Sequence, residues 1–193
     1  MRFINAKFIK SASKKSEFVE DNLPQVALVG RSNVGKSSLI NLLTNNSKMA
    51  KTSGTPGRTR LVNFFDINSQ FYLVDLPGYG YAQASKNTTS AWDKVMNDYF
   101  VENPNLKLVL VLLDSRHTPT ELDLQMLNYL ADLEIPAVIV LTKTDKISRS
   151  ELNLNIDKIS KLVRFNKNRI VSTSASKKQG VQEISTILDE FIK

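Results

Sequence analysis

The sequence predicts an α/β protein built on a mostly parallel sheet of six or more strands, with helices on both faces. Runs of Val, Ile and Leu recur along the chain, and amphipathic, helix-like stretches separate them. Parallel strands joined by helical crossovers are apolar throughout, because the helices bury both of their faces. A chain of 193 residues favours one domain with a sizeable core.

The first half of the chain supplies three strands and a helix. The apolar run 25–30 predicts a strand, and residues 36–45 after it have the period of a helix. Two further runs, 61–67 and 70–76, predict strands joined by a two-residue hairpin turn.

Two helices surround a long central strand. Residues 87–101 have helical periodicity, and residues 106–114 are apolar enough for a fully buried strand. Thr118 starts the next helix, because Glu121 three residues later completes a capping box and Pro119 suits the first helical position.

The last third alternates two strands with two helices. Residues 137–145 and 169–175 predict strands, and residues 181–191 predict the final helix. From Ser150, a helix is predicted by apolar residues at spacings of four, three and four, with basic residues on its other side. The apolar residues are Leu152, Ile156, Ile159 and Val163, and the basic ones are Lys158, Lys161 and Arg164.

Composition excludes several classes of protein. The longest apolar run, from Leu108 to Leu113, has six residues, whereas a membrane-spanning helix needs about 20. The N-terminus scatters its apolar residues among lysines, unlike a signal peptide. With no Cys and one His, disulfides, thiolate metal sites and His-based zinc clusters are excluded. We expect a cytoplasmic protein without membrane contact.

The net charge of +7 lies in one stretch. Residues 143–178 hold ten Lys or Arg and three Asp or Glu. Such a stretch is either a solvated surface or a patch that faces a polyanion.

The segment from Gly30 to Ser37 matches the pattern G-x-x-x-x-G-K-S and joins a predicted strand to a predicted helix. Glycines let such a loop wrap a phosphate chain with its N–H groups, helped by the N-terminus of the helix. In this pattern Lys36 reaches the β- and γ-phosphates, and the Ser37 hydroxyl holds Mg²⁺. The sequence therefore predicts nucleotide binding.

Asp75-Leu-Pro-Gly78 follows a predicted strand. The carboxylate of Asp75 is expected on the Mg²⁺ side of the phosphates, acting through water, and Gly78 is expected to bring an N–H to the γ-phosphate. Between this motif and the phosphate loop, residues 52–60 hold four hydroxyl side chains, two Gly and a Pro. This composition predicts either a switch loop, whose Thr completes the Mg²⁺ coordination, or an ordinary surface loop.

Thr142-Lys143-Thr144-Asp145 ends another predicted strand. The Asp145 carboxylate can accept hydrogen bonds from guanine N1 and N2, a donor pair that adenine lacks, and the stem of Lys143 can cover the base. A backbone N–H at Ser174-Ala175, after the last strand, can meet guanine O6. His117 suggests a general base, but its place at a helix cap favours a structural role in the turn.

Together, GRSNVGKSSLINLL, TPGRT, DLPGYGYA, D-x-R-H-x-P, LTKTD and TSA resemble the EngB family of bacterial translation-factor-like GTPases, from about residue 3 to the end of the chain. DLPGYGYA with D-x-R-H-x-P is specific to that family. Asn usually opens the LTKTD type of motif in GTPases, but Thr, as at Thr142 here, is usual in this group.

The resemblance implies a Ras-like GTPase domain over residues 23–193, with residues 1–22 as a basic lead-in packed on it or flanking it. It implies hydrolysis of GTP to GDP with Mg²⁺, and a mostly monomeric protein that acts in assembly of the large ribosomal subunit, including its RNA. It also implies a requirement for normal cell division and septation.

The resemblance also assigns site residues. The guanine nucleotide contacts map to Gly30, Arg31, Ser32, Asn33, Val34, Gly35, Lys36, Ser37, Gly57, Arg58, Thr59, Arg60, Leu61, Asp75, Leu76, Pro77, Gly78, Thr142, Lys143, Thr144, Asp145, Thr173, Ser174 and Ala175. Mg²⁺ maps to Ser37 and Thr59, and to Asp75 through water. Catalysis is assigned to Lys36, Thr59, Gly78 and Asn33.

In Ras-like GTPases a Gln after the D-x-x-G motif orients the attacking water, and an arginine supplies positive charge. Tyr79 stands at that place here, so we expect slow intrinsic hydrolysis. Some relatives without this Gln use K⁺, held partly by an Asn of the phosphate loop, and Asn33 occupies that position. The alternative is that Asn33 only shapes the loop.

Two other functions stay open from the sequence. A P-loop kinase would share the phosphate loop but would not need Asp145. An RNA-binding assembly module gated by a nucleotide would bind GTP with negligible turnover.

Overall fold

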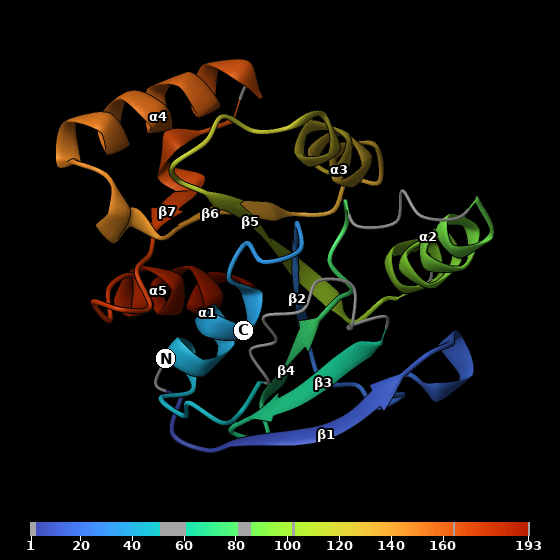
Figure 1. Cartoon of the computed structure of the whole chain (residues 1–193). Helices are drawn as coiled ribbons and strands as arrows, with labels where there is room; N and C mark the ends of the chain where they lie inside the picture. Colours follow the sequence, from blue (N-terminus) through green and yellow to red (C-terminus); the bar gives the residue numbers. More distant parts are fainter. Residues whose placement is uncertain (1–2, 51–60, 81–85, 102, 164, 193) are drawn as a thin grey trace.

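Among the residues that the structure describes, seven strands form one sheet in the order β1-β3-β4-β2-β5-β6-β7 (Figure 1). The structure is a computed structural model that describes residues 3–50, 61–80, 86–101, 103–163 and 165–192, with the side chains of α2 described from Lys94 onward. The strands are β1 (Ala6–Ala12), β2 (Gln25–Gly30), β3 (Val62–Ile67), β4 (Phe71–Asp75), β5 (Leu106–Asp114), β6 (Ala137–Thr142) and β7 (Ile170–Ser172).

Strands β4, β2, β5, β6 and β7 are parallel, β3 is antiparallel to β4, and β1 is antiparallel to β3. The predicted fold class, a mostly parallel sheet of six or more strands, is therefore confirmed. Short 3₁₀ turns lie between the larger elements of the described chain: η1 (Lys15–Glu17), η2 (Thr144–Lys146) and η3 (Lys167–Arg169).

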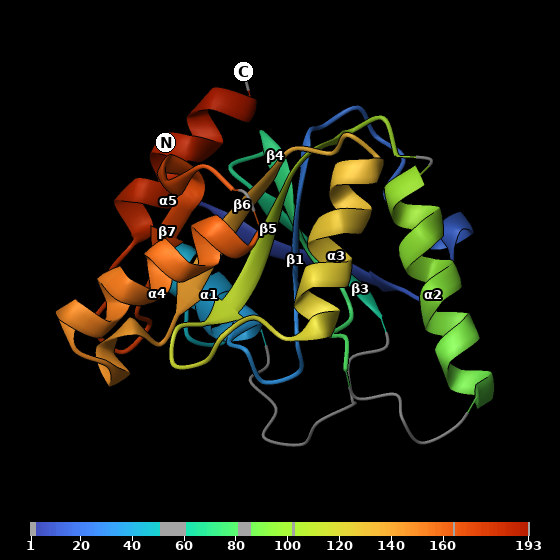
Figure 2. The ribbon, with the colours of Figure 1, turned by 90° about the horizontal axis from the view of Figure 1, so that it is seen from above.

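Helices cover both faces of the sheet (Figures 1 and 2). They are α1 (Lys36–Leu43), α2 (Lys86–Val101), α3 (Glu121–Asp132), α4 (Arg149–Leu162) and α5 (Val181–Phe191). One apolar cluster packs α2, α3 and α4 on one face, and a second packs α1 and α5 on the other. Alternate residues of a strand point to opposite faces, so Val26 and Leu28 join the second cluster and Ala27 and Val29 join the first.

The N-terminal lead-in, which was expected to pack on the domain or to flank it, contributes the edge strand β1. Its side chains support this strand from both sides. Phe8 packs edge-on against Phe65 with ring centroids 5.6 Å apart, and Phe18, after β1, packs against Tyr99 at 5.6 Å. The lead-in therefore adds one strand to the sheet and packs Phe18 against α2.

The predicted start of α3 at Thr118 was wrong. The helix begins at Glu121, and its N-cap is Thr120, whose backbone N–H donates to Asp123 Oδ2 at 2.8 Å. Asp123 satisfies the same spacing from Thr120 that Glu121 satisfies from Thr118, so the capping pattern fits two starting points. The buried carboxylate of Asp123 selects the later one.

Parallel pairing brings the ends of five strands to one edge of the sheet. In register, Leu28 faces Asp75, Gly30 faces Leu112, and Asp114 faces Thr142. Ligands of open α/β sheets bind outside the carboxyl ends of the strands. Every motif of the predicted site that the structure describes follows a strand at this edge.

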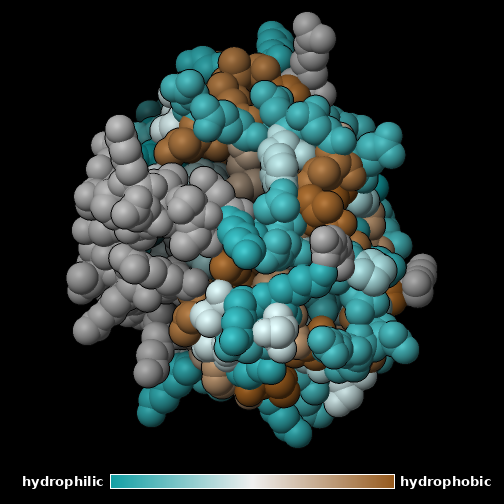
Figure 3. Space-filling model, turned by 90° about the vertical axis from the view of Figure 1, so that its right-hand side faces the viewer, coloured by the Kyte–Doolittle hydropathy of each residue, from teal (hydrophilic) through white to brown (hydrophobic). Residues whose placement is uncertain are grey.

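The surface is a mosaic of polar and apolar residues on the face seen in Figure 3, outside the part drawn in grey. Large apolar side chains exposed elsewhere include Leu154 and Leu162 on α4. No described helix has the length and apolar character needed to cross a membrane.

Candidate nucleotide-binding site

The loop between β2 and α1 turns within five residues, and its glycines make this turn sterically feasible. A Cβ on Gly30 would lie 2.8 Å from Val34 Cγ1 and 2.9 Å from the Leu112 carbonyl oxygen. Gly35 has φ +115° and stands at the N-cap of α1, a conformation that favours glycine. The sequence G-x-x-x-x-G is thus required by contacts of this chain.

Lys36, which is partly buried, and Asp75, which is buried, carry opposite charges that interact beside the loop. Burial lowers the pKa of Lys36, and the charge of Asp75 opposes this shift. Burial likewise raises the pKa of Asp75, against the Lys36 charge and a hydrogen bond from Asn63. Asp75 Oδ1 has no hydrogen-bond partner among the described residues. An unpaired buried carboxylate oxygen beside a phosphate loop fits the carboxylate expected on the Mg²⁺ side.

The segment after Asp75 lies against the phosphate loop. Tyr79 N–H donates to the Gly30 carbonyl at 3.3 Å, and Ser32 N–H donates to the Tyr79 carbonyl at 3.2 Å. The Tyr79 ring is buried, and its hydroxyl donates to Asp123 Oδ1 at 2.8 Å. The phenol at the place of the Ras-type Gln is therefore bonded to α3.

Two side chains at the end of β6 hold carbonyls of the phosphate loop. Thr142 Oγ1 donates to the Val34 carbonyl at 2.7 Å, and Lys143 Nζ donates to the Asn33 carbonyl at 2.9 Å. Lys143 itself has φ +58°, which a residue with a side chain rarely adopts. Thr142, which replaces the usual Asn, supplies a hydrogen bond to the loop at this position.

Asp145 and Ser174 lie together at the neighbouring strand ends. Ser174 Oγ donates to Asp145 Oδ1 at 2.7 Å, and this bond, with Lys146 at 3.2 Å from Oδ2, lowers the pKa of Asp145 to about 2. The carboxylate is therefore ionised at neutral pH and available as an acceptor. Thr144 Oγ1 donates to the Thr173 carbonyl at 2.9 Å, which joins the two segments predicted to read the base.

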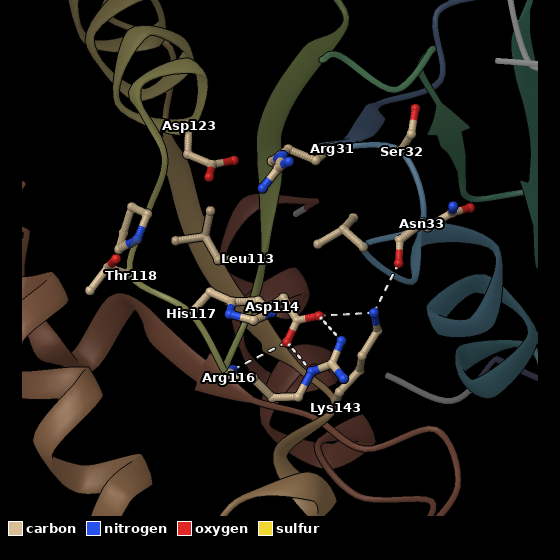
Figure 4. Close-up of a pocket in the computed structure, with 12 residues that line it drawn as sticks. Arg31, Ser32, Asn33, Leu113, Asp114, Arg116, His117, Thr118, Asp123 and Lys143 are labelled. Carbon is tan, nitrogen blue, oxygen red and sulfur yellow. Dashed lines mark hydrogen bonds and ion pairs between the residues drawn. The ribbon is translucent and has the colours of Figure 1, made fainter. Parts of the chain in front are cut away.

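Asp114 is a functional candidate that the sequence reasoning missed (Figure 4). Its Oδ2 accepts from Lys143 Nζ at 2.9 Å, and Arg116 donates to both carboxylate oxygens at 2.9 and 2.7 Å. Against the effect of burial, these bonds hold the pKa of Asp114 well below its usual range. The signal was an acidic residue at a strand end, two residues before an arginine, but its contact with Lys143 depends on the sheet register.

A cavity of about 230 Å³ lies between the phosphate loop and the D-x-R-H-x-P segment (Figure 4). Arg31, Asp123 and Lys143 are among its lining residues. His117 also lines it, and its backbone N–H closes the turn by donating to the Asp114 carbonyl at 3.1 Å. The described contacts of His117 thus fit a role in this turn.

The remaining predicted residues are either outside the described part of the chain or differ in their exposure to solvent. Gly57, Arg58, Thr59 and Arg60, with the rest of the predicted switch loop, lie outside the described residues. Leu61 is exposed, Leu76 is buried in the core, and Ala175 is exposed after Ser174. The described motifs converge on one edge, and their contacts with a nucleotide stay a prediction.

Comparisons with known proteins agree on one family. A family model described as a 50S ribosome-binding GTPase matches residues 25–143. A relative from Clostridium kluyveri, named as a probable GTP-binding protein EngB, is 47% identical over 193 residues, covering 100% of this chain and 98% of the relative.

Solved structures share the fold. The crystal structure of a probable GTP-binding protein engB has a TM-score of 0.72 at 20% identity, covering 87% of this chain and 98% of that chain. Era, in complex with MgGDPNP and nucleotides 1506–1542 of 16S ribosomal RNA, has a TM-score of 0.69 at 24% identity, covering 88% of this chain and 56% of that chain.

Base specificity is expected to depend on Asp145. Asp145→Asn replaces one acceptor with a donor, which suits the carbonyl at C2 of xanthine and repels the amino group of guanine. We expect the preference between GTP and XTP to shift toward XTP, measured by competition for bound labelled nucleotide. Asp157→Asn, an exposed carboxylate paired with Lys167, is the control. A variant that keeps the wild-type preference would contradict the assignment.

The position of Lys143 is expected to depend on Asp114. Asp114→Ala removes a charged acceptor from Lys143, and loss of such a bond changes an equilibrium by about tenfold. We expect guanine nucleotide to dissociate about tenfold faster, measured with a fluorescent GDP analogue. Asp157→Ala, which breaks an ion pair on α4, is the matched control. Dissociation within twofold of wild type would show that Lys143 needs no anchor.

Proposed function

The chain belongs to the EngB family of GTP-binding proteins, which are GTPases, and we propose that it is a nucleotide switch in assembly of the large ribosomal subunit. One observation carries the nucleotide part of the proposal. The phosphate loop, Asp75–Gly78 and the Asp145–Ser174 pair converge at the carboxyl edge of one sheet. A P-loop kinase would not need the third of these.

The phosphates are proposed to lie in the loop from Gly30 to Ser37. Its N–H groups and Lys36 bind them, and Ser37 and Thr59 hold Mg²⁺, with Asp75 acting through water. The metal neutralises charge that develops on the phosphates when GTP is cleaved. The unpaired Oδ1 of Asp75 supports this placement, because a buried carboxylate oxygen is costly without a cation or a donor.

The base is proposed to lie between the Lys143 stem and the segment at Ser174. Asp145 accepts from guanine N1 and N2, and a backbone N–H at Ser174-Ala175 donates to O6. Ser174 Oγ bonds one oxygen of Asp145 and holds the carboxylate in place. Lys143 is itself fixed by Asp114 and by the Asn33 carbonyl, so the face that covers the base is set before binding.

Hydrolysis is proposed to proceed by attack of water on the γ-phosphate, supported by Lys36 and the loop N–H groups. The hydroxyl of Tyr79, at the position of the Ras-type Gln, donates to Asp123. Slow intrinsic turnover is therefore expected, because the phenol is bonded to Asp123 and does not orient the attacking water. Asn33 is exposed, has φ +64°, and turns its amide away from Lys143 (Figure 4).

The partner is proposed to be the large ribosomal subunit or its precursor, including its RNA. The matched family model carries that description, and the Era neighbour was solved with ribosomal RNA. We also propose that the protein is cytoplasmic and is required for normal cell division and septation, as the family resemblance implies.

Some basic residues of the C-terminal stretch 143–178 are paired with acidic side chains, which leaves fewer candidates for contact with RNA. Lys167 pairs with Asp157 at 2.6 Å, and Arg169 pairs with Glu190 at 2.8 Å. Lys158 and Lys161 are exposed on α4, and no ion pair of theirs occurs among the described residues, while Arg164 lies outside them. We therefore propose Lys158 and Lys161 as the RNA-facing charges of α4.

Potassium is expected to stimulate hydrolysis if Asn33 helps to hold it. Replacing Na⁺ by K⁺ at constant ionic strength should raise the rate of phosphate release several-fold, because the smaller sodium ion fits the same oxygens poorly. Asn33→Ala should remove the difference between the two salts. Equal rates in wild-type protein would instead favour stimulation by the ribosomal partner.

Binding to the large subunit is expected to weaken when Lys158 and Lys161 are both changed to Glu. If each contacts a phosphate, the slope of log affinity against log salt should fall by roughly one unit per lost contact. Co-sedimentation at several salt concentrations, with GDP and with a non-hydrolysable GTP analogue, measures this slope. The control is Lys7→Glu with Lys10→Glu on β1, at the other end of the sheet order. An unchanged slope would exclude this face of α4.

A further inference from the structure

Tyr79 is held by the phosphate loop and by α3 at the same time. Its backbone forms a parallel bridge with Arg31, with hydrogen bonds to Gly30 and Ser32 on either side. Its ring is 4% exposed, and its hydroxyl donates to Asp123, which is also 4% exposed. Asp123 is fixed in turn, because its other oxygen accepts from the backbone and the hydroxyl of Thr120 at 2.8 and 2.7 Å.

This arrangement places Gly78 close to the groups expected to bind the terminal phosphate. A Cβ on Gly78 would lie 3.1 Å from Lys36 Nζ, 3.2 Å from Ser32 N and 3.3 Å from Ser32 Cα. The Ser32 N–H, one of the donors of the phosphate loop, is already bonded to the Tyr79 carbonyl. A γ-phosphate seated between Lys36 and Ser32 would have to displace Gly78 and break that hydrogen bond.

We propose that Tyr79 is a specificity-determining residue that favours the diphosphate over the triphosphate, because its bond to Asp123 holds Gly78 over the γ-phosphate position. This inference rests on the proposed GTPase function and names the residue that sets its nucleotide preference. GDP leaves the γ-phosphate position empty and is compatible with the closed segment. GTP binds only after Gly78 has moved away from this closed position. The apparent affinity for GTP is therefore the intrinsic affinity multiplied by the fraction of molecules that are open.

The hydroxyl of Tyr79 can be removed without leaving a large cavity in the core. In Tyr79→Phe the ring still fills its place, and Asp123 Oδ1 loses the donor that it has only in the closed segment. A buried hydrogen bond to a carboxylate changes an equilibrium by about tenfold or more. The equilibrium between the closed and open conformations should therefore shift toward the open one by about that factor. In the wild type, the burial that raises the pKa of Tyr79 keeps its hydroxyl protonated as a donor.

The chain offers a control in Tyr72. Its ring is 6% exposed, and its hydroxyl donates to Asp21 Oδ2 at 2.5 Å, so Tyr72→Phe also breaks a bond from tyrosine to a carboxylate, here an exposed one. Tyr72 lies at the opposite end of β4 from the site, where its N–H bonds the Pro24 carbonyl. A general loss of stability would affect both variants, whereas a change in nucleotide preference should follow only from Tyr79→Phe.

The experiment measures dissociation constants of GDP and of a non-hydrolysable GTP analogue with Mg²⁺ for wild type, Tyr79→Phe and Tyr72→Phe, with thermal unfolding of each. We expect Tyr79→Phe to bind the GTP analogue about tenfold more tightly and GDP within twofold of wild type. Tyr72→Phe should leave both constants unchanged.

An unchanged ratio of the two constants in Tyr79→Phe, or an equal change in Tyr72→Phe, would overturn the inference alone. A wild-type protein that binds neither nucleotide would overturn the proposed function, and this inference with it. Asp123→Asn tests the same bond from its other side, since it weakens the acceptor and should shift the ratio in the same direction.

Discussion

The rest of the site depends on two hydrogen bonds that join the end of β6 to the phosphate loop. Thr142 and Lys143 each hold one carbonyl of that loop, at Val34 and Asn33. The segment predicted to read the base and the loop predicted to hold the phosphates are therefore parts of one rigid unit. A ligand that spans them meets a fixed separation, and preorganisation of this kind reduces the cost of binding.

The opposite charges of Lys36 and Asp75 make it favourable for this unit to bind a ligand. Burial opposes the charge of both groups, and one oxygen of Asp75 has no donor among the described residues. Such a pair is weak support for the fold by itself, because desolvation offsets the attraction. Anything that binds the folded chain there, a phosphate at Lys36 or a cation near Asp75, stabilises the native state by mass action.

The sequence predicted most of the fold, because β2, β5 and β6 are continuous apolar runs buried on both faces. It left β1 open since this edge strand exposes half of its side chains and its register shifts between Phe8 and Lys10. The order of the motifs along the chain predicted the edge of the sheet at which the structure brings their described residues together. The roles of Asp114 and Thr142 could not be read in this way, because each depends on which atoms the pairing of β5 with β6 brings together.

Tyr79, at the position of the Ras-type Gln, has a structural role in the core. At the position where a Gln would orient water, this chain has a ring that belongs to the core between the sheet and α3. The hydrogen bond to Asp123 engages the phenol and is proposed to hold Gly78 over the γ-phosphate position. A residue cannot serve both purposes, since an anchor must stay in place and a water-positioning group must reach the phosphate. The expected slow hydrolysis and the proposed closed state therefore have one physical cause, the hydrogen bond between Tyr79 and Asp123.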